Sequence, residues 1–145
     1  MKNLLPAIKT ALQALPMVTA ENIFITPDVR WRPETTGAPC IGILPAGMER
    51  EELPGEMVGI NAMVHLSVFV PLTANGSDSF VGTNGLYTVL DAATAILKNN
   101  QLGQTDVIRV TIGADEPAEI YQASESAWLV RVTREILYNI ERSIA

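Results

Sequence analysis

The segment from Ile60 to Pro71 constrains the fold of this chain most strongly, because its pattern is that of a long strand with two different faces. Alternate residues from Ala62 to Val70 are apolar, which predicts one buried face. The other face carries Met63, His65, Ser67 and Phe69. This second face is apolar enough to contact a partner and polar enough to remain in water without one. Such a strand favours a component of an assembly over an isolated enzyme.

The length and the cysteine content predict one domain that folds without covalent or metal cross-links. A chain of 145 residues can bury roughly two-thirds of the surface that its unfolded form exposes. Cys40 is the single cysteine, so no intramolecular disulfide can form, as is usual in a reducing compartment. Pro6, Lys9 and Gln13 interrupt the apolar pattern near the N-terminus. We therefore expect neither secretion nor membrane insertion.

The charge balance argues against binding to nucleic acid. The net charge is −6 and the sequence pI is about 4.7, whereas phosphate-backbone binding requires clustered Lys and Arg side chains. An acidic surface would instead repel DNA and leave it free to slide past.

Hydrophobic periodicity predicts two helices and several strands. We expect helices over 4–15 and 86–99, and strands over 21–26, 39–44, 57–71, 107–112 and 127–138. Pro45 and Gly47 are expected to end the second strand, and the acidic segment 48–56 to lead into the long strand as the charged tip of a large antiparallel hairpin. Loops are expected over 27–38 and 73–85 and a turn over 113–117, while the residues after Tyr138 fit either a strand or a short helix.

This order of elements predicts an α+β fold in a single domain, residues 1–145. We expect a mostly antiparallel sheet of about four to five strands, with a long β-hairpin and two helices packed on one face. A doubly wound parallel sheet would need more crossover helices.

The residues able to carry chemistry do not form a recognisable catalytic, cofactor-binding or metal-binding set. His65 is the single histidine and lies within a strand, and Cys40 lies in an apolar strand that gives no electropositive setting. The Gly-rich segment 76–85 precedes a helix but lacks the ending of a phosphate-binding loop. We therefore expect no enzyme activity and no cofactor. The alternative is a small ligand-binding or enzymatic domain that uses His65 and segment 76–85.

Two groups of residues are predicted to form interfaces. Arg30, Trp31 and Arg32 lie in a proline-flanked loop, and Trp and Arg are enriched among residues that dominate binding energy. The alternative is that Trp31 only covers the edge of its own sheet. The second group is acidic and suits contact with a basic neighbour; it consists of Glu49, Glu51, Glu52 and Glu56.

The layout resembles that of the tail terminator proteins of long-tailed bacteriophages, also called tail-completion or minor tail proteins. The matching parts are the first helix, Pro-Cys-Ile-Gly-Ile-Leu at 39–44, the acidic Glu-Arg-Glu-Glu connection, the long strand ending at Pro71, the helix at 86–99 and Ser-Ala-Trp-Leu-Val-Arg-Val-Thr at 126–133. The resemblance covers nearly the whole chain. The sequence departs from the smaller family members in its Arg-Trp-Arg loop and after Tyr138, and these regions are candidates for contact with a different partner.

The resemblance implies a structural virion protein and no covalent chemistry. A homohexameric ring would cap the tail tube protein at the head-proximal end of the tail, stop tube polymerisation and provide the attachment surface for a neck, head-completion or connector protein. Tail sheath is a further partner where the tail has one. Assembly would take place in the host cytoplasm, and DNA would pass through the ring without specific binding. Another neck or head-completion protein is the nearest alternative.

Overall fold

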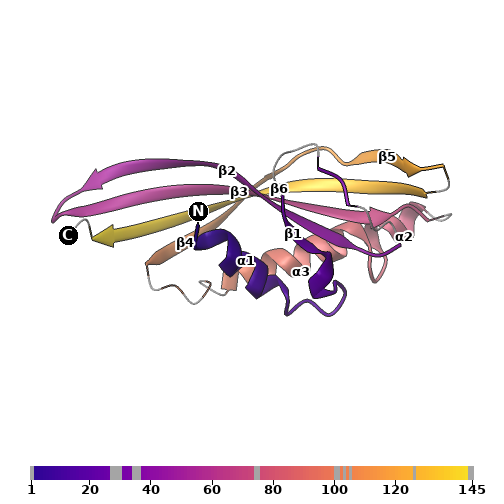
Figure 1. Cartoon of the computed structure of the whole chain (residues 1–145), viewed down its shortest axis with the longest axis horizontal. Helices are drawn as coiled ribbons and strands as arrows, with labels where there is room; N and C mark the ends of the chain where they lie inside the picture. The colour runs from indigo at the N-terminus through magenta and orange to yellow at the C-terminus, as the bar shows by residue number, and fades with distance from the viewer. Residues whose placement is uncertain are drawn as a thin grey trace.

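The computed structural model describes residues 2–26, 31–33, 37–73, 76–99, 102, 104, 106–125 and 127–143. These residues form a long sheet with helices on one side (Figure 1). The elements, in chain order, are α1 (Leu4–Leu12), a 3-10 turn (Ala20–Asn22), β1 (Ile23–Ile25), β2 (Cys40–Leu53), β3 (Met57–Pro71), α2 (Gly76–Val81), α3 (Leu86–Asn99), β4 (Val107–Asp115), β5 (Glu119–Ser124) and β6 (Ala127–Ser143).

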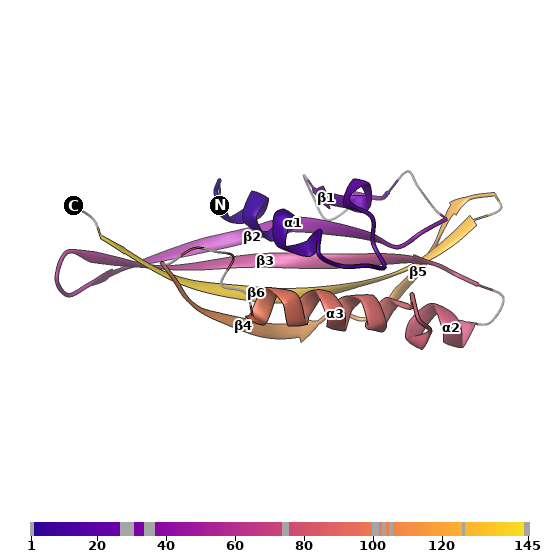
Figure 2. The same ribbon diagram turned by 90° about the horizontal axis from the view of Figure 1, so that it is seen from below.

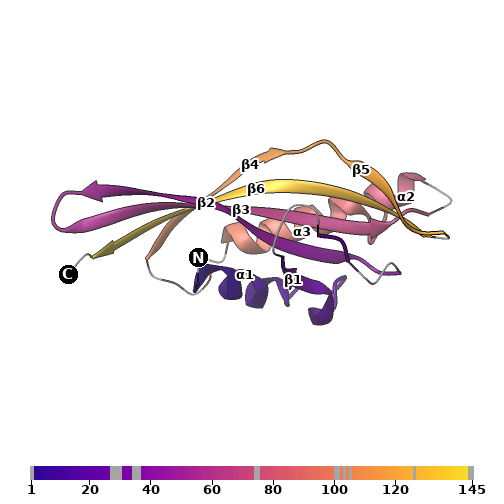
Figure 3. The same ribbon diagram turned by 45° about the horizontal axis from the view of Figure 1, so that its top comes forward.

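The sheet is mixed and mostly antiparallel, with the strand order β1-β2-β3-β6-β4. β2 and β3 form the expected long hairpin, and β3 pairs with β6 without a register shift from Met57 opposite Ser143 to Pro71 opposite Leu129. β1 is parallel to β2. β5 pairs with β6 beside β4, so these two strands follow each other along one edge (Figure 3). The α+β prediction is confirmed, but the described sheet has six strands rather than four to five.

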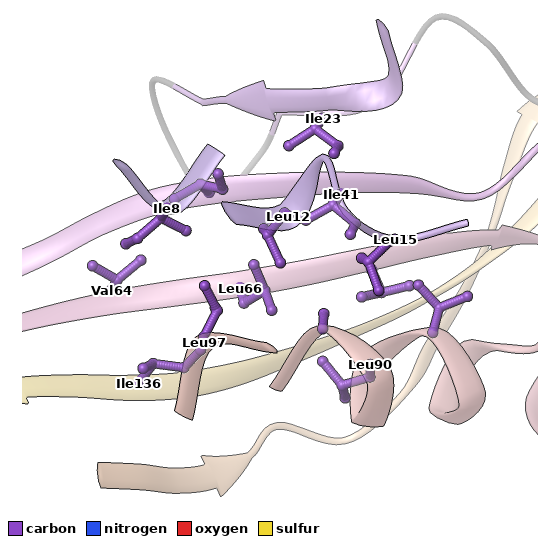
Figure 4. Packing of buried hydrophobic residues seen from close by; sticks show 14 of the residues in the cluster. Ile8, Leu12, Leu15, Ile23, Ile41, Val64, Leu66, Leu90, Leu97 and Ile136 are labelled. Atoms are coloured by element: carbon purple, nitrogen blue, oxygen red, sulfur yellow. The ribbon is translucent and has the colours of Figure 1, made fainter. Parts of the chain in front are cut away.

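Both long helices cover the same face of the sheet, as predicted (Figure 2). The side chains of Ala62, Val64, Leu66 and Val68 are completely buried, because alternation along β3 directs all of them toward α1 and α3. Ile8 and Leu12 of α1 and Leu97 of α3 belong to the same cluster (Figure 4). We call this side the helix-covered face and the opposite side the open face.

The charged residue Arg134 lies on the helix-covered face, opposite the buried Leu66. Its Nε and Nη2 donate to both carboxylate oxygens of Asp115, at 2.6 and 2.9 Å, and its Nη1 donates to Asp91 and Thr94 of α3. The guanidinium thus joins β6, β4 and α3 at a position that the strand pattern alone assigns to an apolar residue.

The prediction that Pro45 and Gly47 end the second strand is wrong. β2 continues to Leu53, with an irregularity in register between Pro45 and Met48 and a φ of +119° at Gly47. β1 pairs with β2 only over residues 41–43, so Pro45 lies where no described strand needs its missing N–H. The hairpin is therefore longer than expected, and its turn is reduced to residues 54–56.

Other differences come from short or terminal segments. The first helix ends at Leu12 rather than at residue 15, in i to i−3 hydrogen bonds. The predicted loop 73–85 contains α2, which Ser79 ties to the end of β3 by accepting a hydrogen bond from Thr73 N and donating one to Pro71 O. β4 runs on into the predicted turn, β5 was not predicted, and the ambiguous tail is strand as far as Ser143.

Candidate interaction surfaces

The first candidate surface is a projection made by 49–53 of β2, 57–61 of β3 and 139–143 of β6, with β4 paired to its base at Asn139 and Ile140. We call it the projecting blade. Its outer part extends beyond α1 and α3 at the end of the sheet where β6 finishes (Figure 1). Strands this long reach past the helices because a strand rises about 3.3 Å per residue and a helix about 1.5 Å.

Acidic side chains cluster on the open face of the blade. Glu51 lies opposite Gly59, which in turn lies opposite Glu141 on the third strand. Glu49 lies on the same face, opposite Asn61. These three carboxylates are exposed and form no ion pair with any described residue. Glu51 and Glu141 face the same side with β3 between them, and Glu49 lies two residues from Glu51. A face with this charge suits a cationic partner.

The other two predicted acidic residues do not share this face. Glu52 lies opposite Val58 on the side of the helices, as does Arg50 opposite Ile60. Glu56 lies in the turn with a φ of 59°. The prediction that these carboxylates lie in the connection before the long strand is thus wrong for Glu49, Glu51 and Glu52. All three lie in β2, where successive side chains point to opposite faces of the sheet.

Trp31 belongs to an aromatic cluster on the open face, at the other end of the sheet. Its ring lies 5.0 Å from that of Phe24 and 5.6 Å from that of Phe69, between ring centroids. It also lies over Gly42, where an added Cβ would be 3.4 Å from the indole. Trp31 is half-buried in its own chain, so the prediction that it anchors an interface stays a prediction. Arg30 lies outside the described residues.

Arg32 is engaged within the chain. Its guanidinium lies 4.7 Å from the centre of the Tyr121 ring, and its Nη1 donates to the Trp31 carbonyl oxygen at 3.0 Å. Glu119 lies 4.0 Å from Arg32 and forms a closer ion pair, at 3.0 Å, with Arg131. Burial raises the pKa of Tyr121 to about 12. Arg32 thus contacts Tyr121 and Glu119 of β5, and Glu119 links it to Arg131 of β6.

His65 lies on the open face beside Ser67, in a hollow of only about 30 Å³, room for about one water molecule. Ser67 and Thr133 share a 2.7 Å hydrogen bond, and no described contact joins either hydroxyl to the imidazole. Cys40 is buried, and burial raises the pKa of its thiol to about 11, which disfavours the reactive thiolate. The Gly-rich segment 76–85 does not line this hollow. The geometry gives no support to a site combining His65 with that segment.

Two features of the surface were missed from the sequence. Glu141 completes the acidic group of the blade, although it is 90 positions from Glu51 in the chain. Ile120 and Trp128 are exposed on the β5–β6 hairpin, with 54% and 45% of their surface accessible. Alternation along β6 could have placed Glu141 on the face of Glu135 and Leu137. No sequence pattern indicated that Trp128 would be exposed, because its strand partner β5 was not predicted.

Comparison of the sequence with protein-family models and with curated proteins gives no match. Within the ranges that the structure describes, there is no cluster of His, Cys, Asp or Glu residues suited to a metal ion. The helices of this part of the chain are too short or too polar to span a membrane.

Proposed function

We propose that this chain is a tail terminator protein of a long-tailed bacteriophage, a structural protein of the virion. Copies of the chain would form a ring, expected to be hexameric, on the last ring of the tail tube. The opposite face of the ring would receive a neck, head-completion or connector protein. The resemblance in sequence layout is the origin of this proposal, and the α+β fold with its long hairpin supports it.

The observation that carries the proposal is the acidic open face of the projecting blade. Glu49, Glu51 and Glu141 place three negative charges on one exposed sheet face, and none of the three forms an ion pair with a described residue. A basic surface on a tail or neck protein would complement this charge and set the orientation of docking.

Capping requires no covalent step. A ring that pairs with the last tube ring on one side, and presents a different surface on the other, leaves no complementary surface for another tube subunit. If the acidic face of the blade lines the central channel instead, its charge would deny passing DNA phosphates any adhesive site.

The test is a charge reversal on one face of the blade. Glu49→Lys combined with Glu51→Lys is compared with Glu21→Lys combined with Asp78→Lys, a matched change of two exposed acids elsewhere in the chain. We expect the blade variant to leave tubes longer than normal or tails without heads, because docking is lost, while the control assembles normally.

The result also separates docking from a role in the channel. Normal assembly with poor DNA ejection would place the acidic face in the channel. Normal assembly and normal ejection in the blade variant would refute both roles. If the unmodified protein neither forms rings nor stops growth of tubes by the tail tube protein, the proposed function is wrong.

A further inference from the structure

We infer that copies of this chain associate head to tail, with the β5–β6 hairpin of one copy seated in a hollow on the projecting blade of the next. The inference rests on the proposed function, because it names the contact that would build the ring. It is carried by two surfaces that lie at opposite ends of the molecule (Figure 1).

The first surface is the exposed apolar pair on the β5–β6 hairpin. Ile120 lies opposite Val130, and Gln122 lies opposite Trp128, so the side chains of Ile120 and Trp128 are diagonal neighbours on one face. About half of each side chain is accessible. Large apolar side chains grouped in this way are typical of an interaction surface, and Trp is the residue type most enriched among binding anchors.

The second surface is a hollow on the helix-covered face of the blade, which we call the blade hollow. It has a volume of about 610 Å³ and is lined by Arg50, Glu51, Glu52, Val58, Ile60, Arg142 and Ser143. Val58 forms the partly accessible apolar floor above the buried side chain of Ile60, while Arg50 and Arg142 lie on the strands that flank it. Asp106 fixes the guanidinium of Arg142 through a 2.6 Å hydrogen bond from Nε.

The chemistry of the blade hollow suits the hairpin of a second copy. Guanidinium groups beside an apolar floor bind the face of an indole favourably, and Trp128 is the largest of the exposed apolar side chains in the described part of the chain. Glu125, exposed at the end of the same hairpin, would pair with Arg50 against the repulsion of Glu51 and Glu52, which also line the hollow. The hollow has the volume of a site for a medium-sized ligand, which is sufficient for Trp128 and Ile120 together.

The hairpin cannot fill the hollow of its own chain. Trp128 and Arg142 lie near opposite ends of β6, and 14 strand residues span about 45 Å. The contact must therefore join two molecules. Because it pairs two different surfaces, it is heterologous, and repetition of it produces a closed ring or an open filament.

Complementary variants test this arrangement. Trp128→Asp damages only the hairpin surface, and Val58→Asp damages only the blade hollow. We expect either change to weaken self-association at least roughly 30-fold, the effect of losing one anchor side chain. Mixed in equal amounts, the two variants retain one intact hairpin and one intact hollow, so they should form a dimer and no larger species. Mass is measured by light scattering after size-exclusion chromatography and by native mass spectrometry.

Two further variants complete the design. Ile25→Asp is the matched control, since Ile25 is 43% exposed on β1 and belongs to neither surface; it should keep the oligomer of the unmodified protein. Arg50→Glu replaces Val58→Asp if the latter does not fold, because Arg50 is exposed on β2.

The outcomes distinguish this inference from the proposed function. A ring that persists in Trp128→Asp, or a mixture that remains monomeric, overturns the inference and leaves the capping function standing. Open chains of increasing mass that Trp128→Asp disrupts support the inference and contradict the ring. An unmodified protein that stays monomeric, or an oligomer that Ile25→Asp also loses, overturns the inference.

Discussion

Replacement of Trp31 by alanine should lower the stability of the folded monomer, apart from any effect on assembly. The indole packs on the rings of Phe24 and Phe69 at 5.0 and 5.6 Å. Removal of a fully buried Trp side chain costs about 3–5 kcal/mol. Because Trp31 is only half-buried, we expect a loss of about 2 kcal/mol in the free energy of unfolding, or about 6 °C in Tm for a chain of this size.

The role in assembly can be separated from this loss by protein concentration. Stability that comes from a contact between subunits rises with concentration, whereas packing within one chain does not. Urea unfolding is followed by circular dichroism at two protein concentrations, one below and one above the concentration at which the oligomer dissociates. The lower concentration measures the loss of packing within the chain, and the higher one adds the loss of contacts between subunits. Interface anchoring by Trp31 predicts a further loss of about 2 kcal/mol at the higher concentration.

The matched control is Trp31→Phe, which keeps an aromatic ring against Phe24 and Phe69. It should recover most of the monomer stability but not the contacts of the indole edge with a partner. A loss below about 0.5 kcal/mol in the Trp31→Ala monomer would refute the packing argument, since a single aromatic pair is worth that much. Equal losses at both concentrations would refute the interface role.

Two other predictions concern buried groups that titrate. The hydroxyl of Tyr138 is buried and has no hydrogen-bond partner among the described residues, so Tyr138→Phe should raise the free energy of unfolding by about 1 kcal/mol or leave it unchanged; a urea midpoint clearly below that of the unmodified protein would contradict this. Burial raises the pKa of Cys40 to about 11 and that of Tyr121 to about 12, from ordinary values of 9.0 and 10.0, and also raises the pKa of Tyr138. Above pH 9 the unfolded chain therefore loses these protons first. The free energy of unfolding should fall as pH rises toward 12, by up to about 1.4 kcal/mol per pH unit for each group, and the urea midpoint should fall with it. Cys40→Ser should remove the decline between pH 9 and 10 and reduce it between pH 10 and 11, where Tyr121 and Tyr138 also contribute. A flat profile from pH 9 to 11 in the unmodified protein would show the reasoning to be wrong.

The core could be predicted because burial imposes a period on the sequence. Alternation from Ala62 to Val70 defined the helix-covered face of β3, and the spacing of apolar residues over 86–99 defined α3 with its observed bounds. Both patterns follow from packing against a large apolar cluster. The antiparallel arrangement followed from the small number of helices.

The length of the strands could not be predicted in the same way. Pro45 and Gly47 are strong signals for a turn, but the sheet accommodates them through an irregular register at a position that β1 leaves uncovered. The faces of Glu49, Glu51 and Glu52 depend on that irregularity, since each residue added to a strand reverses the direction of the next side chain. The ion pair of Arg134 could not be predicted for a related reason. Its partner Asp115 lies at the end of β4, beyond the predicted end of that strand.

The difference in rise between helices and strands explains why the candidate surfaces lie at the two ends. α3 has 14 residues and spans about 21 Å, whereas β3 has 15 residues and spans about 50 Å. Helices of these lengths cannot cover both ends of such a sheet, so apolar positions on the helix-covered face extend past them. At the blade, Arg50 and Arg142 border the partly exposed Val58, beneath which Ile60 is buried. At the β5–β6 hairpin, about half of Trp128 and Ile120 remains in water. A chain with exposed apolar side chains at one end and a hollow at the other would gain more from the head-to-tail association inferred above than from pairing of like ends.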